Sequence, residues 1–231
     1  MKDQTAFETR AGSFGAWSGN VFRDATTLDN GPHAIRTLVG EAGWGRLSSA
    51  VRERFGRAPE PGEVWHLSGV MDLVHCNGLG RLMAWVSRAI GTPVAYLTGH
   101  DVVTDVYVYA DDRIGGTVWE RRYNFSRHRT VIARTTKRID RRGGMLECFG
   151  RGFGMELDVY EKNAALHFRS TSFFTEIAGV KLRLPYLLSP GTLLVEHIDE
   201  GHGTFRFRMT VTHSLFGRVF YQDGVFRKME V

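Results

Sequence analysis

The clearest hydrophobic pattern lies near the end of the chain. Across residues 205–212, apolar and polar side chains alternate strictly, with Phe205 and Phe207 on the apolar face. This period of two is typical of a β-strand with one buried side. A short break at residues 213–217 precedes a second apolar run at 218–226. We expect these two segments to form the closing hairpin of an antiparallel sheet.

The preceding part of the chain, from residue 93 on, also has the pattern of strands. Apolar or alternating runs are separated by turn-forming residues at intervals of about 8 to 12 positions, a spacing typical of sandwiches and barrels. The predicted strands are 94–98, 102–110, 116–125, 130–139, 145–149, 155–160, 165–174, 180–184 and 193–198.

Residues 33–56 have a helical pattern instead. Apolar side chains recur there at spacings of three and four residues, and the Gly-rich residues 43–45 interrupt the pattern. We therefore expect a helix, a break at 43–45, and a second short helix that ends at Gly56.

A strand and a further helix follow. Residues 64–75 have the pattern of a strand with a bulge at Gly69. Residues 79–90 then carry an apolar stripe at helical spacing. Asn77 stands just before this stripe and is a suitable N-cap for the helix.

Composition and length favour one β-rich domain. The chain has 231 residues, and no linker rich in Pro, Ser or charge divides it. Residues 1–29 lack a clear period, so we expect an N-terminal extension followed by a single domain at 30–231. The 27 Gly against 6 Pro suit many tight turns. The predicted fold class is α+β, mainly antiparallel β: a strongly curved sheet or barrel-like structure with N-terminal helices and one helix after the first strand.

Charge and cysteine content narrow the function classes. The formal net charge is +5, but the 30 Lys and Arg are scattered among 25 acidic residues, so we expect no nucleic-acid partner. Cys76 and Cys148 lie in separate apolar segments and are expected to be buried, reduced thiols of a cytoplasmic protein. The N-terminus lacks a signal-peptide core and no run of about 18 apolar residues occurs, so we expect no membrane insertion.

The succession of motifs resembles a known family. Its strongest pieces are the aromatic strand WERRYNF at 119–125 and a terminal pattern carried by Gly203, Phe205, Phe207, Met209, Val211, Leu215, Gly217, Arg218, Tyr221, Gly224 and Phe226. These motifs, within a stretch from His33 to Phe226, resemble DUF4166, domains found alone or fused behind saccharopine-dehydrogenase-like reductases. The resemblance implies a shared fold and, through the fused reductases, a lean towards apolar metabolites or lipids.

Cofactor motifs do not accompany these segments. The chain contains no reductase segment, and its nearest Gly-rich string, 150–154, lies between predicted strands and is expected to be a turn. His197 and Asp199 form an H-x-D pair with His202 and His213 nearby. These residues lack the long separation of oxygenase iron ligands and fit the polar end of a hairpin. We expect neither a cofactor nor a metal.

One predicted strand face is rich in aromatic rings. Trp119, Tyr123 and Phe125 share this face with Arg121. If the face lines a concave interior, Arg121 can hold a carboxylate, enolate or phosphate away from water, and the three rings can bind the substrate. The alternative is a structural arginine that stacks on rings and pairs with a local acid.

Two carboxylates lie within apolar strands. Glu147 and Glu196 are each flanked by residues that favour burial, and a carboxylate in such surroundings has a raised pKa and can move a proton. The alternative places each of them in solvent or beside an arginine of the next strand. We expect Arg121, Glu196 and Glu147 to be catalytic, with Glu196 ranked above Glu147 because the resemblance covers it.

Three further residues are candidates for lining the same cavity. His167 and Arg169 share one strand face and, together with Phe207, would bind substrate beside Arg121. A solvated strand face explains His167 and Arg169 equally well.

These patterns together favour an enzyme that acts on a small molecule. The leading hypothesis is a barrel cavity that binds an apolar or aromatic, lipid-like or polyketide-like molecule and catalyses cofactor-independent isomerisation, cyclisation or elimination. The alternatives are a non-catalytic carrier of a lipid-like ligand and an interaction module for a partner reductase. A homodimer is compatible with each hypothesis.

Overall fold

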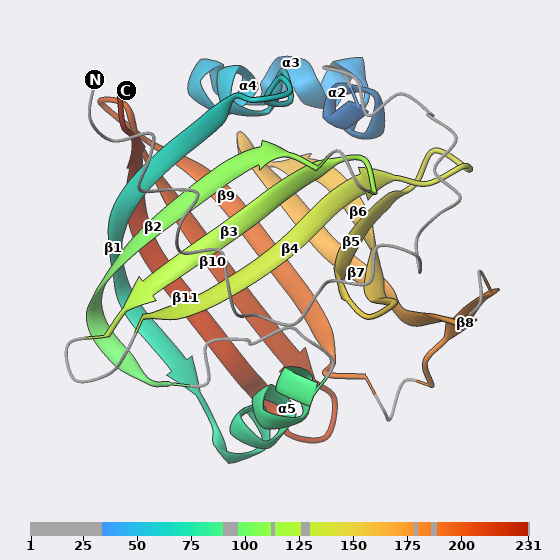
Figure 1. Ribbon diagram of the computed structural model, residues 1–231. Coiled ribbons are helices and arrows are strands. Elements are labelled where there is room, and N and C mark those ends of the chain that lie inside the picture. The colour runs from blue at the N-terminus through green and yellow to red at the C-terminus, as the bar shows by residue number, and fades with distance from the viewer. Residues whose placement is uncertain are drawn as a thin grey trace.

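The computed structural model is an antiparallel β-barrel with helices at both ends (Figure 1). The structure describes residues 34–89, 97–111, 114–125, 130–177, 180–185 and 189–230, without the side chains of 84–89. The extension predicted at residues 1–29 lies outside these ranges. Within them, the prediction of a mainly antiparallel, barrel-like α+β fold is confirmed.

Ten strands form the closed ring of the barrel. The described strands are β1 (Val64–Cys76), β2 (Gly99–Ala110), β3 (Thr117–Asn124), β4 (Val131–Ile139), β5 (Met145–Gly150), β6 (Phe153–Lys162), β7 (Ala165–Ile177), β8 (Val180–Arg183), β9 (Thr192–Gly201), β10 (Thr204–His213) and β11 (Gly217–Lys228). Around the ring the order is β6, β5, β4, β3, β2, β1, β11, β10, β9 and β7, and pairing of β6 with β7 closes it. β8 pairs with the end of β7 and stands outside the ring.

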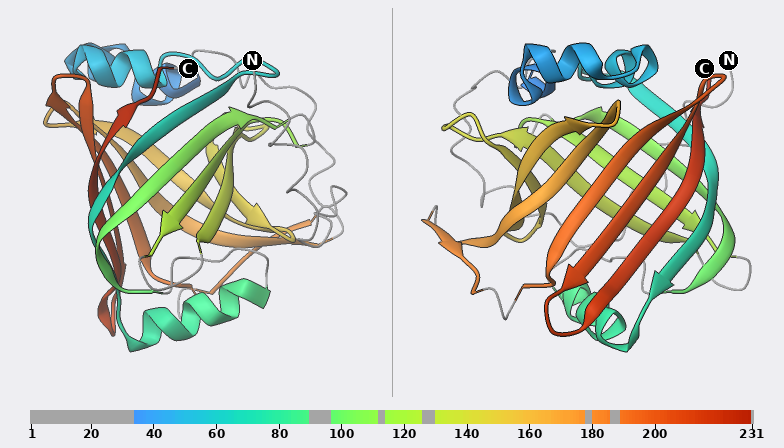
Figure 2. Two further views of the ribbon diagram at one scale, coloured as in Figure 1. Left: turned by 60° about the vertical axis from the view of Figure 1, so that its left-hand side comes forward. Right: turned by 180° about the vertical axis from the view of Figure 1, so that it is seen from behind.

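Short helices cover one end of the barrel, and a longer helix lies at the other end (Figures 1 and 2). The first three described are α2 (Ala34–Val39), α3 (Glu41–Arg46) and α4 (Ser49–Phe55). The Ser48 hydroxyl accepts a hydrogen bond from the Val51 amide and so caps α4. At the opposite end, Asn77 Oδ1 accepts a hydrogen bond from the Gly80 amide, which confirms the predicted N-cap of α5 (Gly78–Ala89).

The closing hairpin also joins the end of the chain to its first strand. β10 pairs with β11 in a register that sets Phe205 opposite Phe226, and β11 then pairs with β1. The hairpin predicted from the alternating pattern is therefore confirmed. Because one face of these strands is apolar, closure of the ring turns that face into the core.

Three local predictions are wrong. Residues 43–45 lie inside α3, and the helical region is interrupted instead at residues 47–48 and at Gly40, whose φ is 75°. Glycine adopts this left-handed conformation without a steric penalty. Residues 97 and 98 are not in a strand, and 94–96 lie outside the described residues. In β1, the register shift falls between Met71 and Leu73 rather than at Gly69.

Gly69 has a packing role in place of the predicted bulge. A Cβ at this position would lie 2.1 Å from the Val225 carbonyl oxygen and 2.7 Å from the Phe226 ring. The absent side chain lets β11 approach β1 closely, and this brings Phe226 into the interior. A glycine within a strand can indicate either a bulge or the close approach of a neighbouring backbone. At Gly69 the second interpretation is the correct one.

Candidate functional site

The inward-facing side chains are identified by contacts that cross the barrel. Tyr123 on β3 donates a hydrogen bond of 3.0 Å from its hydroxyl to Gln222 Oε1 on β11, and two strands, β2 and β1, lie between β3 and β11 along the shorter path of the ring. The ring of Trp119 on β3 lies 6.2 Å from that of His197 on β9. Side chains of such distant strands can meet only through the interior, so this face of β3 points inward.

An aromatic cluster fills the half of the barrel next to α4. His197 lies at its centre, with ring centroids 4.8–6.2 Å from those of Phe55, Phe168, Phe207, Phe205 and Trp119. His197 is buried, with only 5% of its surface exposed. Its Nδ1 has no hydrogen-bond partner among the described residues. Burial, reinforced by the charges of Arg54, Lys137 and Arg121, holds the pKa of His197 well below 6.5. The imidazole is therefore neutral at physiological pH.

A cluster of charged side chains lies beside these rings. Lys137 Nζ on β4 is 3.0 Å from Glu147 Oε1 on β5, and Lys137 and Glu147 are direct partners across the two strands. The ammonium group also lies 5.3 Å from the Trp119 ring and 5.6 Å from the Phe168 ring. Arg121 Nη1 donates a 3.5 Å hydrogen bond to the Thr135 hydroxyl.

Neighbouring charges determine the protonation states of Glu147 and Lys137. Burial alone would raise the pKa of Glu147, but Lys137 and Arg121 outweigh it and hold that pKa below its usual value. Burial lowers the pKa of Lys137, and Glu147 counteracts part of the decrease. Glu147 is therefore an ionised carboxylate at neutral pH. A group in this state is a base rather than the proton donor that a raised pKa would have given.

Arg121 differs from Lys137 in its partners and its exposure. Among the described residues, no carboxylate forms an ion pair with the Arg121 guanidinium, whose central carbon lies 5.7 Å from the centre of the Phe207 ring. Arg121 is only partly buried although it points inward, and so are the inward-facing Leu193 and Met209. Part of the surface at these inward positions is therefore accessible.

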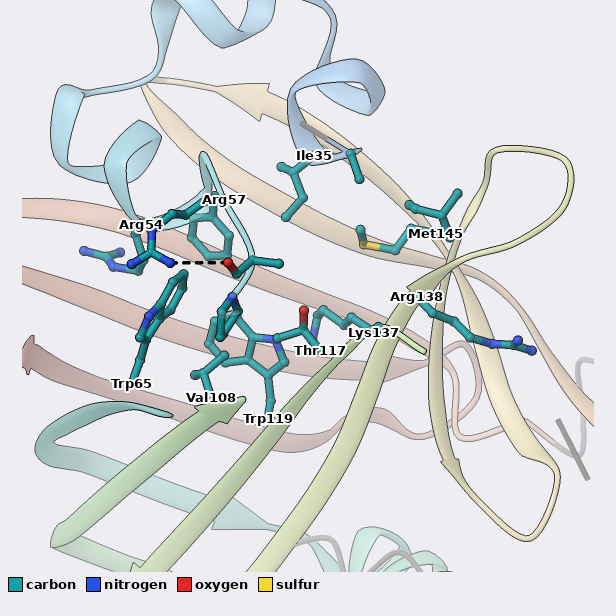
Figure 3. Close-up of a pocket in the computed structure, with 16 residues that line it drawn as sticks. Ile35, Arg54, Arg57, Trp65, Val108, Thr117, Trp119, Lys137, Arg138 and Met145 are labelled. Carbon is teal, nitrogen blue, oxygen red and sulfur yellow. Dashed lines mark hydrogen bonds between the residues drawn. The ribbon is translucent and has the colours of Figure 1, made fainter. Parts of the chain in front are cut away.

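A small pocket opens at the rim beneath the short helices and shares Phe55, Trp119 and Lys137 with these clusters (Figure 3). Its volume is about 70 Å³, and Phe55, Trp65, Thr117, Trp119 and Lys137 contribute to its walls. In Figure 3 the Lys137 side chain runs toward Trp119, whereas Arg138 points away from the pocket. Small-molecule sites usually offer about 300 Å³ or more, so this pocket can hold part of a ligand and not a large one.

The structure places six of the nine predicted site residues in or beside the interior. Arg121, Glu147 and Phe207 face inward and take part in the contacts described above. Trp119 and Tyr123 share the inward face of β3, and Phe125, just beyond that strand, is buried with its ring 6.3 Å from that of Tyr123. The predicted ring-rich face therefore does line the interior.

The other three predicted residues lie on the outer face. Glu196 alternates with the inward-facing His197 on β9; its carboxylate lies 3.4 Å from His167 Nε2 and 3.8 Å from Arg208 Nη1. Arg169 is exposed on β7, opposite Asp158 of β6. The hypothesis that Glu196, His167 and Arg169 line a cavity with Arg121 is wrong, because the one-residue alternation of β7 and β9 directs them outward.

Sequence reasoning did not single out Lys137, Thr135 or Gln222. Thr135 and Lys137 lie on the inward face of β4, while the apolar Ile132 is 39% exposed on the opposite face. The rest of the strand, with Val131 and Ala133 on the inward face and Arg134 on the outward face, favours the observed orientation, but the charge of Lys137 gives no sign that this residue is buried. The available signal was the cross-strand pairing of Lys137 with Glu147, which requires the register of β4 and β5 to be known.

Within the described ranges, no group of three or more His, Cys, Asp and Glu side chains is close enough to hold a metal ion. No helix in those ranges combines the length and the apolar character needed to cross a bilayer.

Comparison with known proteins places the chain in a family. A model of DUF4166, a domain of unknown function, matches residues 47–226. This segment takes in α4 and the barrel strands up to Phe226 in β11, and thus the whole inward-facing cluster. Searches of curated proteins and of solved structures found no match. Since the matched segment spans most of the 231 residues, the chain belongs to the DUF4166 family.

Proposed function

We propose that the barrel binds an apolar or aromatic small molecule against its inward-facing rings and transforms it by acid–base chemistry without a cofactor. The observation that carries the proposal is Arg121, a cation that points into the barrel, keeps accessible surface and has no ion-pair partner among the described residues. An inward cation beside rings suits a ligand that has an apolar body and carries or develops negative charge.

The proposed chemistry is a proton shift next to a carbonyl group. Glu147, held ionised by Lys137, takes a proton from a carbon that lies between the carbonyl group and a C=C bond. The C–H electron pair forms a new C=C bond to the carbonyl carbon, and the C=O π pair moves onto the oxygen to give a dienolate. Arg121 stabilises that oxygen, and Glu147 then returns the proton to the far carbon of the original C=C bond as the C=O bond re-forms, which completes an isomerisation. General-base catalysis of this kind contributes about 10²–10⁴-fold to the rate, and a preorganised charge adds more. Glu196 has no part in this scheme because it lies outside the barrel.

A non-catalytic carrier is the second candidate. It is favoured by the close ion pair of Glu147 with Lys137 and by the hydrogen bond that Glu147 accepts from Thr135. A carboxylate engaged in this way can be a structural counter-ion that sets the charge of the binding site. In the carrier, Arg121 would hold an acidic group of the ligand and no proton would move.

Solvent deuterium distinguishes the two candidates. The small molecule extracted from the purified protein is incubated in D₂O with wild-type protein, with Glu147→Gln and with Arg169→Met, which alters an exposed arginine of the outer face. The enzyme proposal expects deuterium in the molecule with the wild type and with Arg169→Met, and none above the protein-free rate with Glu147→Gln. Equal exchange with and without protein would refute proton transfer and leave the carrier.

A further inference from the structure

Large apolar side chains are exposed at the end of the barrel that carries α5. Leu215 and Phe216, consecutive in the turn between β10 and β11, are 69% and 56% exposed, and Leu82 on α5 is 57% exposed. Single exposed apolar residues are common on soluble proteins, whereas exposed apolar residues that lie together mark interaction surfaces.

The turn that carries this pair has defined internal contacts. The Leu215 amide donates a 3.2 Å hydrogen bond to His213 Nδ1, and the Phe216 ring lies 5.0 Å from the His213 ring. Gly217 follows with a φ of 65°, a conformation that favours glycine and turns the chain into β11. The two apolar side chains are therefore presented by an organised turn.

The first turn of α5 is fastened to the start of β11, so Leu82 lies at the same end as Leu215 and Phe216. Asn77 Nδ2 donates a 3.2 Å hydrogen bond to the Arg218 carbonyl oxygen, and a Cβ at Gly80 would lie 2.3 Å from the Val219 carbonyl oxygen. Figures 1 and 2 both place the β10–β11 turn beside the beginning of α5.

The charge directly around the exposed apolar residues is positive. Residues 77–83 at the start of α5 and residues 211–222 around the β10–β11 turn contain no Asp or Glu. Arg81 and Arg218 are exposed within them. Basic residues interspersed with exposed apolar side chains match the chemistry of an anionic lipid surface, in which phosphate groups lie above an apolar layer.

We propose that the apolar tip formed by Leu82, Leu215 and Phe216 docks on the surface of an anionic lipid bilayer, with Arg81 and Arg218 at the level of the phosphate groups. Two or three side chains at the boundary of headgroups and acyl chains give weak, reversible attachment and not insertion. This docking surface is independent of the acid–base function, because none of its residues faces the interior cluster.

Vesicle flotation tests the proposal with the full chain. Wild-type protein is expected to float with vesicles of phosphatidylcholine and phosphatidylglycerol more than with phosphatidylcholine vesicles, and added salt is expected to reduce the difference. The double variant Leu215→Ser/Phe216→Ser should bind the mixed vesicles at least about tenfold more weakly than the wild type. Arg81→Glu/Arg218→Glu should remove the preference for the anionic lipid.

The matched control is Leu182→Ser, which alters an apolar residue 49% exposed on β8, away from the apolar tip; it should float as the wild type does. The proposal is overturned if the wild type does not float with the mixed vesicles, or if Leu215→Ser/Phe216→Ser and Leu182→Ser weaken flotation equally. It is also overturned if flotation is unchanged in Leu215→Ser/Phe216→Ser while size-exclusion chromatography shows loss of a dimer, since a second copy of the chain would then cover the tip.

Discussion

Lys137 Nζ and Glu147 Oε1 lie 3.0 Å apart inside the barrel, on directly paired positions of β4 and β5. Both side chains are almost completely buried, with 10% and 6% of their surface exposed. In this region of low polarity, the attraction between the two charges is therefore the main interaction that offsets the loss of their hydration. Removal of one partner leaves a buried charge that cannot be solvated, which is the costly way to break such a pair.

The first prediction concerns this ion pair. Lys137→Met should lower the free energy of unfolding by about 3–5 kcal/mol, because the Glu147 carboxylate is left buried without its partner. The double variant Lys137→Met/Glu147→Met should recover most of that loss, since no charge remains. Urea denaturation of the wild type, both single variants and the double variant measures the coupling. Single variants as stable as the wild type would show that the pair contributes no net stability.

A second prediction concerns pH. The pKa of His197 is held well below 6.5 in the folded protein, so below pH 6.5 the unfolded chain takes up a proton that the folded chain does not. The unfolded state then binds more protons, and stability is expected to fall with decreasing pH by up to about 1.4 kcal/mol per pH unit. Urea denaturation between pH 7 and pH 5 should show a shallower slope for His197→Phe, with the exposed His202→Asn as control. An unchanged slope would contradict the buried, neutral state of His197.

A third prediction tests the close approach of β1 and β11. Gly69→Ala places a methyl group 2.1 Å from the Val225 carbonyl oxygen, so the strands must separate and the stability should fall by about 1–3 kcal/mol or more. Gly45→Ala is the matched control, because a Cβ there meets nothing within 4 Å and alanine favours a helix. Thermal denaturation should show destabilisation at position 69 and none at position 45; equal melting temperatures would contradict the packing described here.

A fourth prediction concerns the cysteines. Burial raises the pKa of the Cys148 thiol to about 11, and it also raises that of Cys76. Both side chains are buried, so iodoacetamide at mildly alkaline pH should modify neither in the folded protein and both in urea. Mass spectrometry of the alkylated protein measures this. Rapid, stoichiometric labelling of Cys148 under native conditions would show that the strands around it open readily.

The fold could be predicted from the sequence because its main signals are local. Strict alternation at residues 205–212 indicates both the type of element and its buried face, and the break expected at residues 213–217 contains the β10–β11 turn. Short glycine-containing segments were harder. Residues 43–45 read as a break but are helical, because tertiary packing of α3 on the barrel outweighs the weak helix propensity of glycine.

The candidate site could be predicted only where one strand face was clearly distinct. On β3 the rings and Arg121 share a face, and that face lines the interior. On β9 both faces carry apolar residues, so the sequence could not decide whether Glu196 or His197 points inward. The structure turns His197 inward and pairs Glu196 with Arg208 outside. On β4 the charged Lys137 is inside, and its position depends on a partner on another strand.

Native mass spectrometry of the protein as purified, compared with Arg121→Met and Arg169→Met, tests most directly whether the interior at Arg121 is a ligand site. The account predicts that the wild type and Arg169→Met carry the same bound small molecule and that Arg121→Met has lost most of it. Removal of the inward cation should weaken the binding of an anionic or enolisable ligand. Replacement of the exposed Arg169 on the outer face should leave that binding unchanged. Equal occupancy in all three proteins, or a wild type that carries nothing, would contradict it.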